Sequence, residues 1–297
     1  RGIAASFAYD ALNRLTSLTY PTAGEDVTYG YDTCANGIGR LCSVTDPTGT
    51  RTYAYDGLGR TASVTWTTSN QVFTTSYTWT PADRLASITY PSGRVVSYTR
   101  NSLGQISAIA TGGQNIVTGR TYRADGLLTG QTYGNGLVDT RAYDLQGRLT
   151  SWTTGTIDSR TYGYDANGNI TSINATTFGY DWLDRIVSSN SMLNFTWDAN
   201  GNRTSHTWGG LLDGYTTHAS NNRLTAITGP RATAYTYDNA GNTLSGEGAT
   251  YTYSPFNRLA TATKAGITTT YAINALGQRV HKKVGSGADH WFTYGPG

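Results

Sequence analysis

The sequence predicts an all-β fold in which tandem antiparallel β-hairpins form one long sheet wound into a spiral or shell. The first observation is compositional: the 297 residues include 51 Thr, 22 Tyr and 36 Gly, but only 2 Glu, 3 Lys and 1 Met. Residues that favour surface helices are nearly absent, whereas those that suit a half-buried pleated surface are in excess. The second observation is a repeated motif, and the third is an alternation of aromatic and small residues. Together they exclude a helical bundle and a doubly wound α/β fold.

The repeated motif has the form Tyr-Asp-x-x-Gly-Arg-Leu. We count fourteen units, with Arg-equivalent positions at 14, 40, 60, 84, 105, 127, 148, 169, 185, 202, 223, 242, 258 and 278. A period near 20 residues indicates one repeated supersecondary unit that cannot bury its own apolar face alone. The structural repeat is clearest at Tyr55, Asp56, Gly59 and Arg60, at Tyr143, Asp144, Gly147 and Arg148, at Tyr164, Asp165 and Gly168, and at Tyr237, Asp238 and Gly241.

Each unit has the pattern of a β-hairpin. Before the Asp, two aromatic residues flank a small one, as at Tyr53 and Tyr55, which places both rings on one face of a strand. The Asp can bond the backbone two residues on, and Gly accepts the left-handed conformation that closes a type I turn with a bulge. A return strand follows, as in 84–90, and a second class of turns, such as 90–93, links one hairpin to the next.

The number of hairpins predicts a curved sheet. Fourteen hairpins correspond to on the order of 28 strands, which would make a flat sheet roughly 130 Å wide. Open sheets rarely exceed about 10 strands without curling, so the sheet must wind into a spiral, shell or tube. We interpret 1–297 as a single repeat region and a fragment of a larger shell. Longer units in 1–65 and 66–160 and tighter units in 161–280 indicate a change of curvature rather than a domain boundary.

Two kinds of contact are expected to hold the sheet. Aromatic cross-strand pairs contribute about 0.2–1 kcal/mol each, and exposed Asp–Arg pairs about 0–1 kcal/mol. The aromatic ladders should therefore dominate, while Asp and Arg shape the turn. An Arg can also lie flat on a Tyr of the neighbouring unit.

This motif, at this spacing, resembles the YD-repeat or Rhs (rearrangement hotspot) family, from Tyr9 to about Tyr294. Segments 36–41, 133–137 and 274–280 fit the same pattern. The resemblance implies a hollow β-shell, which in bacterial Rhs proteins and the C component of Tc toxins encloses a toxic C-terminal domain. In teneurins a related shell belongs to an adhesion ectodomain. The bacterial shells usually end in a self-cleaving aspartyl segment and a variable toxin; neither is found here, so no protease residue is carried over.

Cys34 and Cys42 are the only cysteines, and they flank an insertion in the unit of Tyr31. They form either a disulfide that staples this loop or two free buried thiols. A disulfide fits an extracellular or periplasmic setting. Two Cys without a nearby His make an incomplete ligand set, so we expect no metal.

The remaining polar candidates favour structural roles. None of the four histidines lies in a metal-binding or nucleophile motif, so we expect surface or packing positions. The stretch 205–217 is either a loop that reaches a partner or a longer hairpin. One Asp every 20 residues is no calcium site or catalytic pair. Exposed rings could stack on sugars, but packing is the default interpretation. The histidines are His206, His218, His281 and His290.

These observations favour a structural protein over an enzyme, with no catalytic residue, cofactor or metal. The leading hypothesis is a shell wall that encapsulates a C-terminal toxin or effector of a bacterial secreted or cell-surface toxin. Its partners would be the cargo and neighbouring shell repeats. The alternatives are a glycan-binding adhesin and an extracellular filament or tube assembled through edge strands. A net charge of +3 argues against nucleic acid, and no apolar run reaches the roughly 18 residues of a membrane span. No signal-peptide pattern is present and the chain opens at Arg1, so we expect a processed product or a piece of a longer protein.

Overall fold

The computed structural model describes residues 2–22, 24–190 and 192–294. Within these residues it contains thirty β-strands and no helix, which confirms the all-β prediction. Strands that follow one another along the chain pair in antiparallel fashion, for example β5 (Gly49–Tyr55) with β6 (Thr61–Thr67). Strands β1 to β23 belong to a sheet of 23 strands, and β24 to β30 belong to a second sheet of seven.

The chain divides into two compact units. Unit 1 takes the described residues of 1–94 and 234–297, and unit 2 is 95–233. The remaining strands of unit 1 are β1 (Ser6–Tyr9), β2 (Leu15–Thr19), β3 (Val27–Tyr31), β4 (Leu41–Asp46), β7 (Val72–Trp79), β8 (Leu85–Thr89), β24 (Thr236–Tyr237), β25 (Thr243–Gly246), β26 (Ala249–Tyr253), β27 (Leu259–Lys264), β28 (Ile267–Ile273), β29 (Arg279–Val284) and β30 (Asp289–Trp291).

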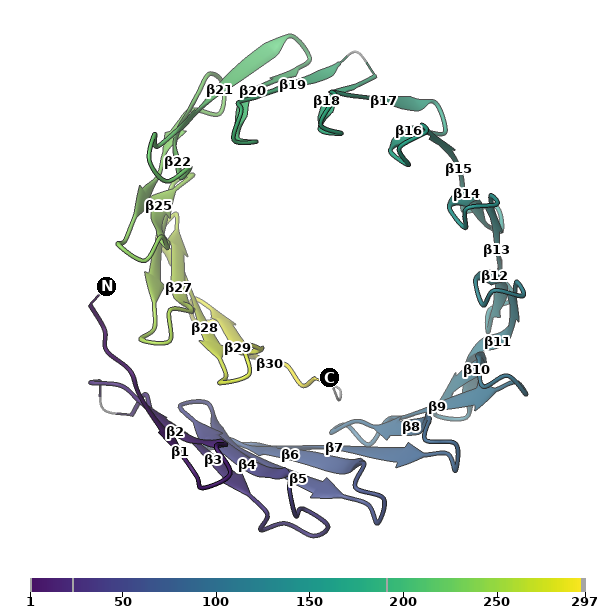
Figure 1. The fold of residues 1–297 in the computed structure, drawn as a ribbon, viewed down its shortest axis with the longest axis vertical. Helices are drawn as coiled ribbons and strands as arrows, with labels where there is room; N and C mark the ends of the chain where they lie inside the picture. The colour runs from purple at the N-terminus through teal and green to yellow at the C-terminus, as the bar shows by residue number, and fades with distance from the viewer. Residues whose placement is uncertain (1, 23, 191, 295–297) are drawn as a thin grey trace. The chain divides into compact units, whose positions relative to one another are not determined.

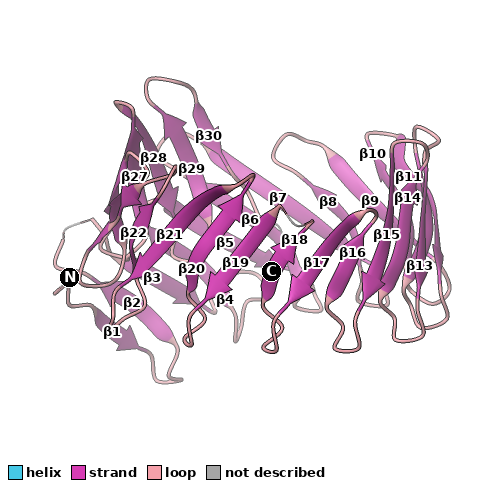
Figure 2. Ribbon diagram, turned by 90° about the horizontal axis from the view of Figure 1, so that it is seen from above, coloured by secondary structure: helices cyan, strands magenta, loops and turns pink. Residues whose placement is uncertain are grey.

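Unit 2 contains the strands from β9 to β22, which follow one another along a curved strip (Figure 1). They lie side by side with their turns at the two ends of the strands (Figure 2). The short β23 (Thr233–Ala234) falls at the boundary between the units. The strands of unit 2 are β9 (Val95–Arg100), β10 (Ile106–Thr111), β11 (Gln114–Tyr122), β12 (Leu128–Tyr133), β13 (Val138–Tyr143), β14 (Leu149–Thr154), β15 (Asp158–Tyr164), β16 (Ile170–Ile173), β17 (Thr176–Tyr180), β18 (Ile186–Ser189), β19 (Leu193–Trp197), β20 (Arg203–Trp208), β21 (Leu211–Thr217) and β22 (Leu224–Thr228).

The sheet changes between β22 and β24, where the sequence predicted continuous pairing. Gly229 adopts a φ of 94°, and Pro230 follows it. Proline has no backbone N–H to give to a ladder, so strands that contain it end early or lie at an edge. Strand β22 accordingly ends at Thr228, before Gly229 and Pro230, and the β23 and β24 that follow are only two residues long.

Unit 1 has an apolar core between its N-terminal and C-terminal strands. Val27, Val44 and Val280 are almost completely buried, and the Trp66 ring lies 5.7 Å from that of Trp291. A polar contact joins the same two segments: the backbone N–H of Ala275 donates to Asp46 Oδ2 at 2.7 Å. These residues are more than 200 positions apart in the chain, so neither segment completes this core alone.

Candidate functional site

In most repeat turns the first residue closes the turn with its side chain. Asp56 Oδ1 accepts from the backbone N–H groups of Leu58 at 2.9 Å and Arg60 at 3.0 Å. Asp56 Oδ2 accepts from Arg60 Nε at 2.7 Å. Gly59 lies between them with a φ of 78°, a conformation that favours glycine. The structure repeats this arrangement at Asp144 and Arg148, where the corresponding Nε–Oδ2 distance is 2.6 Å.

The same hydrogen bonds perturb the ionisation of the turn carboxylates. The side chain of Arg60 is the main cause that holds the pKa of Asp56 below its ordinary value. At Asp165, burial opposes the shift, but hydrogen bonds from Asn169 still lower the pKa of the carboxyl. Because the charged form is the one that accepts these bonds, the turns are built around ionised aspartates.

Three donor–acceptor pairs occupy the turn interchangeably. Among the described residues, four turns pair Asp with Arg. Three others pair Asp with Asn; Asn169 Nδ2, for example, donates to Asp165 Oδ2 at 3.0 Å. In two turns the first residue is itself an Asn and donates to a Gln four residues on. The pairs of the last two kinds are Asp165/Asn169, Asp198/Asn202, Asp238/Asn242, Asn101/Gln105 and Asn274/Gln278. Every version satisfies one donor with one acceptor, so even the units with weak sequence similarity keep the turn.

Most repeat units also clamp an aromatic residue of the following repeat unit. The Arg148 guanidinium carbon lies 4.6 Å from the centroid of the Tyr164 ring, which is a cation–π contact. The Tyr164 hydroxyl donates to the carbonyl of Leu149 at 2.8 Å. One Arg-Leu dipeptide therefore holds both the face and the hydroxyl of the next ring, and this clamp couples neighbouring hairpins.

The hydrogen bond that the ring hydroxyl or indole N–H donates in this clamp recurs in both compact units of the chain. In every pair except that of Tyr294 the donor is the residue directly before a repeat turn, and the acceptor is a return-strand carbonyl of the preceding repeat unit. The donor–acceptor pairs are Tyr31–Leu15, Tyr55–Leu41, Trp79–Thr61, Tyr122–Ile106, Tyr143–Leu128, Tyr164–Leu149, Tyr180–Ile170, Trp197–Ile186, Tyr253–Thr243 and Tyr294–Arg279. Cation–π contacts accompany this bond at Tyr31, Tyr55, Trp79, Tyr143, Tyr164 and Trp197.

One face of the sheet carries these rings, and we call it the ring-bearing face. It consists of the residues one, three and five positions before each turn, such as Tyr143, Arg141 and Asp139. The position five residues before the turn is deeply buried in several units. Its occupants include Val27, Arg51, Thr75, Asp139, Asp213 and Ala249, all less than 9% exposed.

Sequence reasoning missed the charged residues at this position. Asp139 accepts from Trp152 Nε1 at 2.5 Å and pairs with Arg141 at 2.9 Å. Asp213 accepts from Arg231 Nε at 2.6 Å. Burial acts to raise the pKa of Asp213, but the hydrogen bonds from Arg231 outweigh this effect and hold the pKa below its ordinary value. The available signal was the spacing: a charge an even number of residues before a ring, two at Asp213 and four at Asp139, lies on the same face of the strand as that ring.

Cys34 and Cys42 form a disulfide, with their Cα atoms 5.4 Å apart. It joins the inserted turn to the start of β4, and Cys42 is buried. The sulfur atoms are therefore engaged with each other. In the described residues, no group of three or more His, Cys, Asp or Glu side chains is gathered as a metal site.

The histidines occupy separate places. His206 stacks on Phe195 with centroids 4.9 Å apart, and its Nδ1 lies 2.7 Å from Arg231 Nη2. The stretch around it is a hairpin, β20 and β21, closed by two glycines. His281 Nε2 contacts Asp289 at 2.8 Å, while His218 and His290 are exposed.

Comparisons with known proteins agree with this repeat geometry. Residues 36–70 and 79–116 match the family model described as RHS repeat, and 132–206 match the model described as teneurin YD-shell. The predicted resemblance to the YD-repeat family is confirmed. No curated protein matches the chain.

Solved structures share the YD-shell fold. The chain is 16% identical to TcdB2–TccC3 over 95% of its own length, with a TM-score of 0.71. The values are 16%, 95% and 0.70 for TcdB2–TccC3–Cdc42, and 16%, 95% and 0.68 for a Photorhabdus luminescens Tc holotoxin pore. The chain spans only 18% to 19% of the length of these proteins. At this level of identity the similarity establishes the fold alone.

Proposed function

We propose that this chain is a wall segment of a hollow shell that encapsulates a toxin or effector in a bacterial secreted or cell-surface protein. The observation that carries the proposal is the structural similarity to Tc toxin proteins over 95% of the chain. The whole of 1–297 serves as one repeat region in this proposal. Its partners are the cargo and neighbouring shell repeats.

The mechanism is physical, and no residue is assigned covalent chemistry. Each hairpin depends on its neighbours, because a ring of one unit is held by the Arg and a carbonyl of the unit before it. In a wall made in this way each hairpin is stabilised by the hairpins on either side of it. Such a wall therefore keeps an enclosed chain away from proteases and from its own host until delivery.

Secretion is supported by the disulfide, since such bonds persist in oxidising compartments. Among the described residues, no helix has the length and apolar character needed to cross a bilayer.

Limited proteolysis of the complete polypeptide that contains this chain tests the proposal. We expect the cargo to stay intact at protease concentrations that degrade the isolated cargo. Tyr143→Ala with Tyr164→Ala removes two clamped rings and should expose the cargo, whereas Leu145→Ser, at a fully exposed turn tip, should not. Equal digestion of enclosed and isolated cargo would contradict encapsulation.

A second candidate is assembly into filaments or tubes by strand pairing. Strand β1 pairs with β2, and all four of its residues are exposed, including Phe7 and Tyr9 at 57% each. Such an edge can template pairing with another chain. Electron microscopy that shows only single particles at high protein concentration would exclude this role. Glycan binding stays a prediction, which a glycan array tests.

A further inference from the structure

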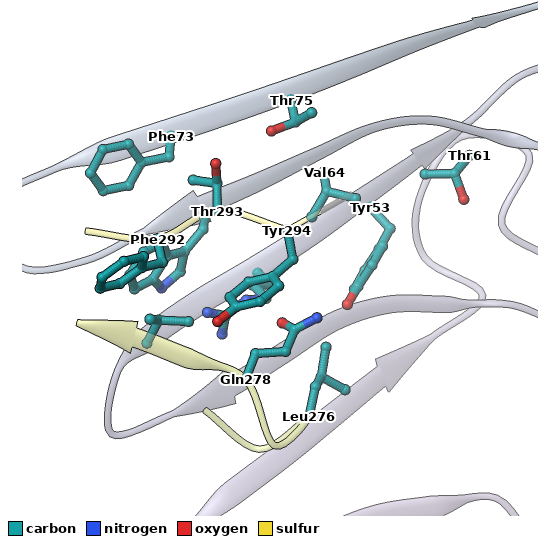
Figure 3. A pocket seen from close by; sticks show the side chains of 13 residues that line it. Tyr53, Thr61, Val64, Phe73, Thr75, Leu276, Gln278, Phe292, Thr293 and Tyr294 are labelled. Carbon is teal, nitrogen blue, oxygen red and sulfur yellow. The ribbon is translucent and has the colours of Figure 1, made fainter. Parts of the chain in front are cut away.

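Unit 1 contains a partly enclosed cavity of about 200 Å³ between β5–β7 and the C-terminal segment. Figure 3 shows Tyr53 and Gln278 pointing toward one another beside Tyr294. The aromatic wall includes Trp66 and Phe73, whose rings stack with centroids 5.3 Å apart. Of the residues that line it, Thr61 and Tyr294 also take part in clamp bonds.

Arg51 is the only charged residue among the described residues that line the cavity. Its side chain is 6% exposed, and its guanidinium lies 4.8 Å from the centroid of the Trp66 ring. Burial lowers the pKa of Arg51 below its ordinary value. A buried cation of this kind normally has a close, hydrogen-bonded counterion.

The nearest carboxylate serves Arg51 poorly. Arg51 Nη1 lies 3.6 Å from Asp46 Oδ2, which already accepts from the backbone N–H of Ala275 at 2.7 Å. Asp46 Oδ1 accepts from both the N–H and the hydroxyl of Thr48. Asp46 does not line the cavity. Arg51 Nη1 also donates to the Thr48 hydroxyl at 3.5 Å. The ion pair with Asp46 is thus longer than a direct hydrogen bond, and the carboxylate lies behind Arg51, away from the cavity lining.

We propose that this cavity binds a small monocarboxylate that carries one aromatic ring. The planar guanidinium fork of Arg51 matches a carboxylate, and Asp46 at 3.6 Å leaves that fork without a direct carboxylate hydrogen bond. Rings stack on Trp66, Phe73 and Tyr294 in the offset or edge-on arrangements that aromatic groups prefer. The volume suits this class, because a cavity of about 150 Å³ holds a benzene molecule. Leu276 and Tyr294, exposed by 46% and 43%, form the entrance.

The test uses 3-phenylpropionate at pH 7, with calorimetry for affinity and backbone amide shifts at Phe73 and Gln278 for location. We expect saturable binding and shifts at both residues. The neutral 3-phenylpropionamide and the ring-free hexanoate should each bind at least about tenfold more weakly, because each loses one of the two recognition elements.

Two variants and a matched control complete the test. Arg51→Met should weaken binding by at least about tenfold. Leu276→Trp, at the exposed entrance, should block binding without altering the buried arginine. Arg160→Met removes another arginine that lies over a tryptophan, 5.3 Å from the Trp152 ring, and should leave affinity unchanged. Equal affinity for acid and amide, no binding at the solubility limit, or undiminished binding by folded Leu276→Trp would each overturn the proposal.

Discussion

Units 1 and 2 use the same repeat turn and the same clamp but bury different residues. In unit 1 the deeply buried side chains are mainly apolar, with Val27, Val44 and Trp66 among them. In unit 2 the largest side chains that are fully buried, among the described residues, are those of Asp139 and Asp213. The turn and the clamp are formed by backbone groups and local side chains, so they do not depend on what packs against the ring-bearing face.

The comparison separates two sources of stability. Unit 1 gains from apolar burial between segments distant in the chain, which is the dominant favourable term in folding. Unit 2 instead places carboxylates at equivalent positions and satisfies them with Arg, Trp and Gln donors; Gln131 Nε2, for example, lies 3.3 Å from Asp139 Oδ2. A buried ion pair contributes little net stability, but loss of one partner is costly.

The largest expected effect is in unit 1. Trp66→Ala removes a ring that is 4% exposed and contacts Phe73 and Trp291, so it should lower the free energy of unfolding by about 3–5 kcal/mol. Urea denaturation measures it. Trp182→Ala, at 86% exposure, is the control and should change stability by less than about 0.5 kcal/mol. Comparable losses of unfolding free energy in the two variants would show that burial of the ring does not decide its contribution to stability.

The next effect distinguishes breaking a buried pair from replacing it. Asp139→Val leaves Arg141 and Trp152 without their acceptor and should cost about 3 kcal/mol in urea denaturation. Adding Arg141→Tyr recreates the Val-x-Tyr-x-Tyr pattern of Val27 to Tyr31 and should recover more than half of the loss. If the double variant is no more stable than the single one, the buried position in unit 2 does not accept the apolar pattern that unit 1 has there.

The disulfide should have an intermediate effect. Cys34→Ser with Cys42→Ser opens a loop with a sequence separation of 8 and should lower the stability of unit 1 by about 2 kcal/mol. Thermal unfolding of the wild type with and without reductant gives the same comparison without mutation. A reductant effect that persists in the double variant would show that the bond is not its cause.

The hydroxyl bond of the clamp should contribute less. Tyr164→Phe keeps the ring under Arg148 and removes only the bond to Leu149, at an expected cost of about 1 kcal/mol. Tyr9→Phe, on the exposed β1, is the matched control and should be neutral. A neutral Tyr164→Phe would assign the coupling between units to the rings alone.

The smallest effect is a pH dependence confined to unit 2. Burial, together with the charges of Arg231 and Arg203, lowers the pKa of His206 below its ordinary value. Arginine only donates, so His206 Nδ1 must accept and the ring is neutral. The unfolded chain takes up a proton at a higher pH than the folded one, so stability is present above about pH 6.5 and falls as the pH drops from 7 toward 5.

His206→Gln should flatten this dependence in denaturation curves recorded at pH 7, 6 and 5. His290→Gln, at an exposed position, should retain the wild-type slope. The same slope in both variants would show that His206 is not the group that titrates.

The sequence was sufficient for the repeats because everything that defines them is local. Turn closure joins residues four apart, as at Asp56 and Arg60, and the spacing shows it directly. The contact of Asp46 with Ala275 joins residues 229 apart and leaves no periodic signal. The same holds for the break after Gly229 and for the cavity at Arg51. Those features depend on which distant strands pack together, which repeat spacing does not determine.

Native-state hydrogen exchange in low denaturant tests the central comparison most directly. The account predicts that amides of β4–β6 and β29 in unit 1 exchange only with the largest opening free energy. It also predicts that the strands of unit 2 open together at one lower value, because each is held by its neighbours. Independent exchange of single hairpins in unit 2, or equal protection of both units, would contradict it.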